Sequence, residues 1–252
     1  MLIDNSSTIE GTGSWLLATY RPVSLFTLRT TYATSKGGKT LLVPTPYAVK
    51  LALVDACFRA YGADNAEPVA RDVFDLVKDR EIRFSPPDRC VVQNTFIKVK
   101  QEERDAPKGI YCSTVSYREF CFFDGDLTIA INAKGMDKEK SNLLSNVMRH
   151  INYFGKRGSF FQFLGSKLAT ELPGGFSLFE SDTDFKMDTY GIMQPLDDVG
   201  DTDDPDLFDR VSSYSYGKGL TLGKHRVLKN TFLPYRMVKS TRSYTYYSRA
   251  SI

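Results

Sequence analysis

Two amphipathic helical patterns, each preceded by a strand-like segment, limit the folds open to this chain. For the first, Thr45 and Pro46 supply an N-cap and a first helical position, and Gly62 supplies a stop. Between them, apolar residues recur at the i, i+3, i+4, i+7 spacing of a helix that buries one face. The predicted buried stripe is Val49, Ala52, Leu53, Ala56, Cys57 and Ala60.

A second amphipathic helix is predicted after Asp137, whose carboxylate can cap it. A more polar helix is predicted over residues 67–80, closed by Ser85-Pro86-Pro87. Both predictions rest on local signals alone. The apolar stripe of the helix after Asp137 is Leu143, Leu144, Val147, Met148 and Ile151.

Segments before, between and after these helices have the pattern of strands. They cover residues 14–33 (interrupted at Arg21-Pro22), 90–100, 113–123, 127–132 and 159–165. Asp124-Gly125-Asp126 lies between the third and fourth and is a strong hairpin signal. The order predicts an α+β fold with a ferredoxin-like (RRM-like) βαββαβ core in residues 1–170. Residues 171–252 are predicted to form an elaborated β-rich lobe, with one or two strands returning to the sheet.

Charge is segregated near the C-terminus. Residues 180–209 carry eleven acids and one base, whereas residues 211–252 carry eight bases and no acid. The acidic run 197–209 is predicted to be a mobile loop. An acid-free basic tail that also contains aromatic residues is typical of a protein that binds a polyanion, and a solvated tail without a partner is the alternative.

Several classes of protein are excluded or disfavoured. The four cysteines are far apart and are typical of core thiols in a reducing compartment, neither a zinc site nor a disulfide framework. The N-terminal residues lack the pattern of a signal peptide, and no apolar stretch is long enough to span a membrane, so we expect a cytoplasmic protein. The spacing around Gly37-Gly38-Lys39-Thr40 does not match a phosphate-binding P-loop. We expect no metal and no cofactor.

Three glycine-containing basic segments are candidates for contacts with phosphate, because glycine lets the backbone approach an anion closely. The first is the loop 35–40. The second is Gly155-Lys156-Arg157-Gly158, which is equally consistent with a charged turn. The third is the segment 217–226 in the basic tail.

Catalysis by acid–base chemistry would need a positioned histidine. His150 lies near a predicted helix end, where it is typical of a partner for the helix dipole. His225 has basic neighbours that would keep it neutral, so it could act as the base in metal-independent RNA cleavage. This endoribonuclease remains the alternative to a protein that only binds RNA.

The motifs, taken in order, resemble the Cas-five proteins, which are RAMP-superfamily subunits of type I CRISPR Cascade complexes. The resemblance covers roughly residues 14–165, and the glycine-rich segment 217–223 is similar to the RAMP glycine-rich loop. The acidic run 197–209 departs from the family pattern. The segments that carry the likeness are TLLVPTPYAVKLALVDACF, FIKVK, SYREFCFFDGDLTIAI and INYFGKRGSFFQFL.

The resemblance implies a non-catalytic subunit that caps the 5′ handle of the CRISPR RNA (crRNA). It also implies contacts with the large subunit and with the backbone subunit, and target DNA is a further candidate partner. One branch of the family cleaves precursor RNA with a Tyr/Lys/His set, which cannot be placed in this sequence. A purely structural adaptor is a third hypothesis.

Twelve residues are the candidate RNA-binding set, and Tyr32, Tyr47 and Tyr235 are candidates to stack on bases. Most of the affinity is expected from cations that contact phosphate. The set is Arg29, Lys36, Lys39, Tyr47, Lys156, Arg157, Lys218, Lys224, His225, Arg226, Arg236 and Arg242.

Overall fold

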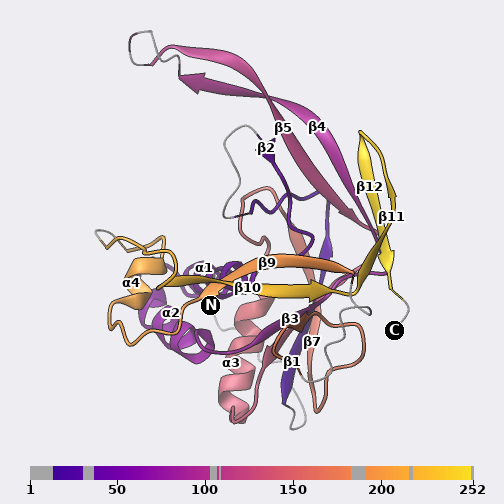
Figure 1. The fold of residues 1–252 in the computed structure, drawn as a ribbon. Helices are drawn as coiled ribbons and strands as arrows, with labels where there is room; N and C mark the ends of the chain where they lie inside the picture. The colour runs from indigo at the N-terminus through magenta and orange to yellow at the C-terminus, as the bar shows by residue number, and fades with distance from the viewer. Residues whose placement is uncertain are drawn as a thin grey trace.

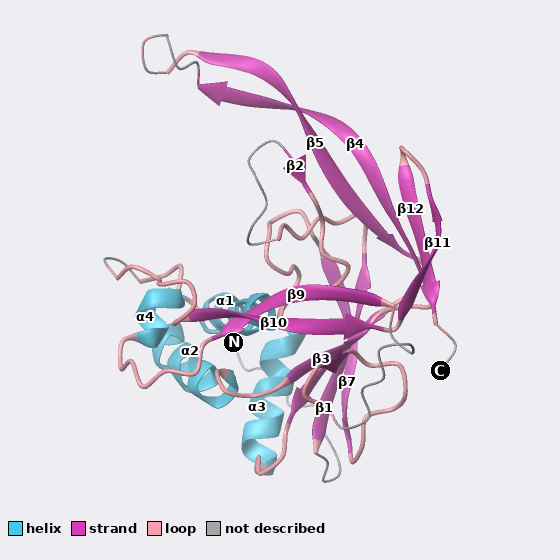
Figure 2. Cartoon of the chain, viewed as in Figure 1, coloured by secondary structure: helices cyan, strands magenta, loops and turns pink. Residues whose placement is uncertain are grey.

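The computed structural model describes residues 14–30, 37–102, 107, 109–182, 191–215 and 218–250 (Figures 1 and 2). The helices are α1 (Pro46–Tyr61), α2 (Ala63–Val77), α3 (Lys138–Arg149) and α4 (Leu207–Val211). The strands are β1 (Trp15–Pro22), β2 (Gly37–Gly38), β3 (Ile82–Ser85), β4 (Arg89–Glu102), β5 (Tyr111–Phe123), β6 (Leu127–Asn132), β7 (Phe161–Ala169), β8 (Leu178–Phe179), β9 (Ile192–Val199), β10 (Arg226–Leu233), β11 (Tyr235–Ser240) and β12 (Tyr244–Arg249).

A four-stranded antiparallel sheet of order β3-β6-β1-β7 forms the centre of the fold. Counted along the chain, these four strands lie in the order 2-3-1-4, with α1 after the first and α3 after the third. This is the split βαβ arrangement of a ferredoxin-like fold. The Tyr20 hydroxyl donates a hydrogen bond to the Met148 carbonyl at 2.8 Å, which joins β1 to α3. The predicted fold class is confirmed.

The two main helices begin where their capping residues predict. The Thr45 hydroxyl accepts a hydrogen bond from the Ala48 amide at 3.1 Å, and Gly62 ends α1 at a φ of 75°. The Asp137 carboxylate accepts a hydrogen bond from the Lys140 amide at 2.7 Å. The more polar helix α2 begins directly after Gly62, four residues earlier than predicted, and ends at Val77.

The predicted hairpin between residues 113–123 and 127–132 is wrong. β5 pairs with β4, whereas β6 pairs with β1 and β3 of the other sheet. The Asp124-Gly125-Asp126 turn therefore carries the chain from one sheet to another, and Gly125 has a φ of 135°. The second strand of the ferredoxin sheet is the short β3, which the prediction missed because only four residues precede Pro86-Pro87.

The strands β4 and β5 form a long ribbon inserted between the second and third strands of the ferredoxin sheet. Figure 1 shows the ribbon reaching well beyond the body of the molecule. At its base it joins a five-stranded sheet of order β11-β12-β4-β5-β2. The basic tail thus returns as three strands, β10, β11 and β12, none of which joins the ferredoxin sheet as predicted.

The acidic run 197–209, predicted to be a mobile loop, is irregular only over residues 200–206, because its first residues belong to β9 and its last to α4. Asp197 and Asp198 end β9, and each is only 3% exposed. The Lys50 ammonium, on α1, lies 2.6 Å from the Asp198 carboxylate and 2.7 Å from the Lys78 carbonyl at the end of α2. This buried pair joins the antiparallel strands β9 and β10 to α1, beside which they lie in Figure 2.

The first predicted strand stops earlier than expected. β1 ends at Pro22, and only isolated bridges follow, Phe26 to Cys121 and Arg29 to Thr40. A register shift falls between Thr19 and Tyr20, slightly before the predicted interruption at Arg21-Pro22. Of the four predicted core thiols, Cys57, Cys90 and Cys121 are buried, whereas Cys112 on the ribbon is exposed.

Candidate nucleic-acid interface

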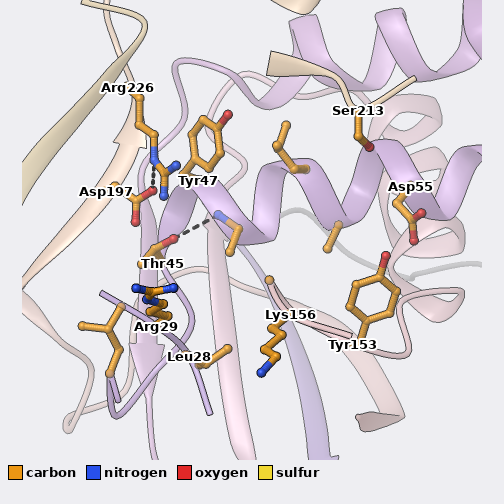
Figure 3. A pocket seen from close by; sticks show the side chains of 15 residues that line it. Leu28, Arg29, Thr45, Tyr47, Asp55, Tyr153, Lys156, Asp197, Ser213 and Arg226 are labelled. Atoms are coloured by element: carbon orange, nitrogen blue, oxygen red, sulfur yellow. Dashed lines mark hydrogen bonds and ion pairs between the residues drawn. The ribbon is translucent and has the colours of Figure 1, made fainter. Parts of the chain in front are cut away.

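A cavity of about 500 Å³ lies between α1, the turn after α3 and the start of β10. Four candidate residues from separate parts of the chain line it: Arg29, Tyr47, Lys156 and Arg226. In the view of Figure 3, Tyr47 and Arg226 lie above the cavity, and Arg29 and Lys156 lie below it. Its floor is apolar and is formed by Leu28, Leu41, Ala48, Leu51 and Ala52.

Each of the four side chains is placed by a local feature of the fold. Arg29 is paired with Thr40 in an isolated bridge that closes the loop between them. Tyr47 stands in the first turn of α1, directly after its cap. Lys156 lies in the turn that follows α3, and Gly155 there has a φ of 63°, which favours glycine. Arg226 begins β10.

Arg226 is held in place on two sides. Its guanidinium forms an ion pair with the buried carboxylate of Asp197 and lies 4.5 Å from the centre of the Tyr47 ring. Burial raises the pKa of the Tyr47 hydroxyl to about 12, so Tyr47 is neutral at physiological pH. The three side chains together form a rigid wall that presents both charge and a flat surface to the cavity.

Lys156 contributes charge that no carboxylate of the described chain neutralises. The side chain is exposed, and neither a hydrogen bond nor an ion pair of its ammonium is found among the described residues. Arg29 is also exposed at the cavity rim. An apolar floor beneath such a rim suits a ligand that is flat and apolar at one end and anionic at the other.

A second cavity of about 430 Å³ lies at the base of the ribbon. Two further candidates, Lys39 and Arg242, line it together with Arg118. Phe96 and Tyr117 also line it, are 61% and 50% exposed, and have ring centroids 4.0 Å apart. Exposed aromatic rings beside cations are the usual platform for single-stranded nucleic acid.

The ribbon continues this platform outward on one face. Phe96 pairs with Tyr117, Lys98 with Val115 and Lys100 with Ser113, and cross-strand partners share a face. The sequence prediction missed Phe96 and Tyr117. The alternation of Ile97 and Val99 with two lysines indicated a strand with one charged face, but the contact between Phe96 and Tyr117 depends on the pairing of β4 with β5.

Arg29 lines the first cavity, and Lys39, which precedes the bridge partner of Arg29, lines the second. Of the remaining candidates, those within the described residues line neither cavity. Lys36 and Tyr32 lie outside the described residues. Arg157, Lys224 and Arg236 are exposed elsewhere, and Lys218 forms an ion pair with Asp206 at 2.6 Å. The described members of the candidate set are therefore divided between two cavities and other positions.

His225 is buried, with 3% of its surface exposed. Its Nδ1 accepts a hydrogen bond from the Thr221 amide at 2.9 Å, so Nε2 carries the proton and donates to the Asp204 carboxylate at 3.1 Å. Both ring nitrogens are used in holding the turn before β10. Neither is available to take a proton from an RNA hydroxyl.

Tyr235 is also buried, with no exposed surface. Its hydroxyl donates to the Pro87 carbonyl at 2.6 Å, and its ring cannot stack on a base. Within the described ranges there is no cluster of three or more histidine, cysteine, aspartate or glutamate residues arranged to hold a metal ion. In the same part of the chain, no helix combines the length and apolar character needed to cross a membrane.

The split βαβ order of the central sheet, with the ribbon inserted after its second strand, defines a ferredoxin-like protein. No family model matches the sequence. Over 124 residues the chain is 29% identical to the CRISPR-associated protein Cas5 of Archaeoglobus fulgidus. The alignment covers 49% of this chain and 53% of that protein, so it spans about half the length of the curated relative.

The predicted resemblance to the Cas-five family is thus confirmed, because about half of the chain is similar in sequence to Cas5. Two solved structures are also similar. A CRISPR protein from Archaeoglobus fulgidus has a TM-score of 0.46 and 10% identity, with coverage of 94% of this chain and 92% of that one. A chain of a CRISPR RNA-guided surveillance complex has a TM-score of 0.45 and 13% identity, with coverage of 86% and 88%.

Proposed function

We propose that this protein is an RNA-binding subunit of a CRISPR effector complex that caps the 5′ handle of crRNA. One observation carries the proposal: Arg29, Tyr47, Lys156 and Arg226, which are far apart in sequence, line one cavity with an apolar floor. The homology to Cas5 supports the same assignment.

In this proposal the cavity holds a nucleotide of the handle. Arg29 and Lys156 contact its phosphates at the rim, and the apolar floor and the Arg226 guanidinium face its base. The strand continues past Lys39 to the ribbon, where Phe96 and Tyr117 stack on neighbouring bases. Stacking of this kind contributes about 1–3 kcal/mol per base, and the cations supply the salt-dependent part of the affinity.

The proposal is tested by measuring the affinity of the purified protein for handle RNA at several salt concentrations. The variant Arg29→Gln/Lys156→Gln should bind roughly tenfold or more weakly at low salt, because a hydrogen bond to a charged group contributes about 1.5–3 kcal/mol. Its log–log salt slope should be shallower by about 0.7 for each phosphate that the protein no longer neutralises.

Lys167→Gln is a matched control, because Lys167 is exposed on β7 and lines neither cavity. It removes one charge and should leave the affinity nearly unchanged. Equal reductions in affinity for Lys167→Gln and for a single Lys156→Gln variant would show that net charge, and not the cavity, determines binding. The cavity would then not be the RNA site.

We propose that the subunit does not cleave RNA, since the histidine predicted as the base is buried and fully hydrogen-bonded. Incubation with repeat RNA and a chelator decides the point. Specific cleavage that survives the chelator would establish the endoribonuclease instead. If neither cleavage nor an RNA crosslink is detected in the assembled complex, the structural adaptor is the correct interpretation.

The proposed partners are crRNA, the large subunit and the backbone subunit, with target DNA as a further candidate. Exposed apolar side chains on the ribbon and at its base support contacts with other subunits. Among them are Phe122, Ile110, Tyr111 and Val115.

A further inference from the structure

The acidic segment 197–209 lies against the basic tail, and four aspartates of the segment contact basic residues of the tail. The Asp197 carboxylate pairs with Arg226, and Asp198 with Lys229 at 2.8 Å. Asp204 lies 3.1 Å from His225, and Asp206 lies 2.6 Å from Lys218. The tail that appears in the sequence as a free polycation is therefore partly neutralised in the folded protein.

These pairs are of two kinds. Asp197, Asp198 and Asp204 have side chains that are at most 10% exposed, so their partners are held by carboxylates that cannot move away. The pair between Asp206 and Lys218 differs, because its side chains are 41% and 39% exposed. An exposed pair of this kind contributes only about 0–1 kcal/mol, so a phosphate group can compete for the lysine.

Within the described residues, the Asp206 carboxylate has no partner other than Lys218. The backbone amide of Asp206 donates to the Asp204 carboxylate at 2.9 Å, and its carbonyl accepts from the Arg210 amide at 3.0 Å. Asp206 precedes α4, but its side chain makes no capping hydrogen bond. Lys218 lies a few residues after Ser213, which lines the first cavity. The carboxylate of Asp206 thus acts on one cation of the basic tail and contributes little to the stability of the helix that it precedes.

We propose that Asp206 is a specificity-determining residue that weakens the binding of Lys218 to RNA of any sequence. The inference rests on the proposed RNA-binding function. Non-specific binding is almost wholly electrostatic and depends on the number of available cations. RNA seated in the first cavity is held by Arg29, Lys156 and the apolar floor, and does not depend on Lys218. Neutralising Lys218 therefore lowers the non-specific affinity for RNA of any sequence and leaves the affinity for handle RNA unchanged.

The test compares the affinities of the full-length wild-type protein and of Asp206→Asn for handle RNA and for polyuridine of the same length. Asp206→Asn should bind polyuridine about two- to fivefold more tightly, because an exposed pair worth up to about 1 kcal/mol no longer has to be broken. Its salt slope for polyuridine should be steeper by about 0.7. The affinity for handle RNA should change by less, so the ratio of the two affinities should fall.

Asp203→Asn is the matched control, since Asp203 is exposed and has no partner within the described residues. It changes the net charge equally but releases no lysine, and should raise the polyuridine affinity by less. The double variant Asp206→Asn/Lys218→Gln should bind polyuridine as weakly as wild type. Equal effects of Asp206→Asn and Asp203→Asn would overturn the inference and leave the RNA-binding function intact.

Two further outcomes separate the inference from the function on which it rests. If the wild-type protein binds neither RNA, the proposed function is itself wrong, and the inference fails with it. If the wild-type protein binds handle RNA and polyuridine equally, the handle-specific part of the function is wrong. An unchanged melting temperature of Asp206→Asn shows that any change in affinity does not come from loss of the fold.

Discussion

At the scale of single residues, burial decides whether an aromatic side chain can meet RNA. Tyr235 and Tyr117 both lie in strands of the same sheet, yet Tyr235 has no exposed surface and Tyr117 is half exposed. Burial raises the pKa of the Tyr235 hydroxyl, which remains protonated and donates to the Pro87 carbonyl. The first residue is therefore a structural link between β11 and the segment before β4, and the second is available for stacking.

The variant Tyr235→Phe tests this assignment. It leaves the buried Pro87 carbonyl without its partner, so the free energy of unfolding should fall by about 1–3 kcal/mol. The affinity for RNA should not change. Urea unfolding and an RNA titration measure the two quantities, and a variant as stable as wild type would show that the Tyr235 hydroxyl contributes nothing to the fold.

At the scale of elements, the ribbon β4–β5 differs from the other strands in what it packs against. Beyond Phe96 and Tyr117, its residues are exposed or half-exposed on both faces except Ser116, and none belongs to the buried core. A two-stranded ribbon alone is marginally stable in water. Its length and its lysines are therefore better explained by binding than by folding.

We predict that replacing residues 98–115 with a tight Asn-Gly turn leaves the melting temperature of the body unchanged. RNA affinity should fall, and its salt slope should be shallower by up to about 2.8, since four cations are removed, Lys98, Lys100, Arg104 and Lys108. Lys98→Gln/Lys100→Gln in a full-length ribbon is the control for the loss of the two lysine charges alone. A lower melting temperature of the shortened protein would mean that the ribbon is part of the cooperative unit.

At the scale of the whole molecule, one hydrophobic core crosses the predicted boundary at residue 170. The core cluster contains Leu16 of β1 and Leu53 of α1, and it also contains Leu196 of β9, Leu233 of β10 and Tyr235 of β11. The division into residues 1–170 and 171–252 remains a prediction. A shared core leads us to expect that the two segments stabilise each other.

We therefore predict a single cooperative unfolding transition in urea. The fluorescence of Trp15, the one tryptophan, reports on β1, and far-ultraviolet circular dichroism reports on all the strands. The two curves should coincide if the chain unfolds in one step. Separate transitions, or a fragment 1–170 that folds alone, would support the two-domain division instead.

Local signals predicted much of the fold. The caps at Thr45 and Asp137 and the apolar stripes behind them involve contacts within a few residues, and the helices begin where predicted. The pairing of β5 was predicted wrongly, because a good turn at Gly125 specifies a change of direction but not which strand lies alongside. For the same reason, the exposed pair of Phe96 and Tyr117 could not be recognised before β4 and β5 were aligned.

The sequence by itself determined the helices, most of the strand segments and the positions of the basic residues, because these depend on short-range patterns of apolar, capping and charged side chains. Only the tertiary structure decided which strands pair and which cations remain available. Arg226 and Lys218 are bound to aspartates 29 and 12 residues away, whereas Lys156 has no such partner in the described chain. The sequence shows which residues are cations, but whether a cation can bind a phosphate depends on which carboxylates the fold brings beside it.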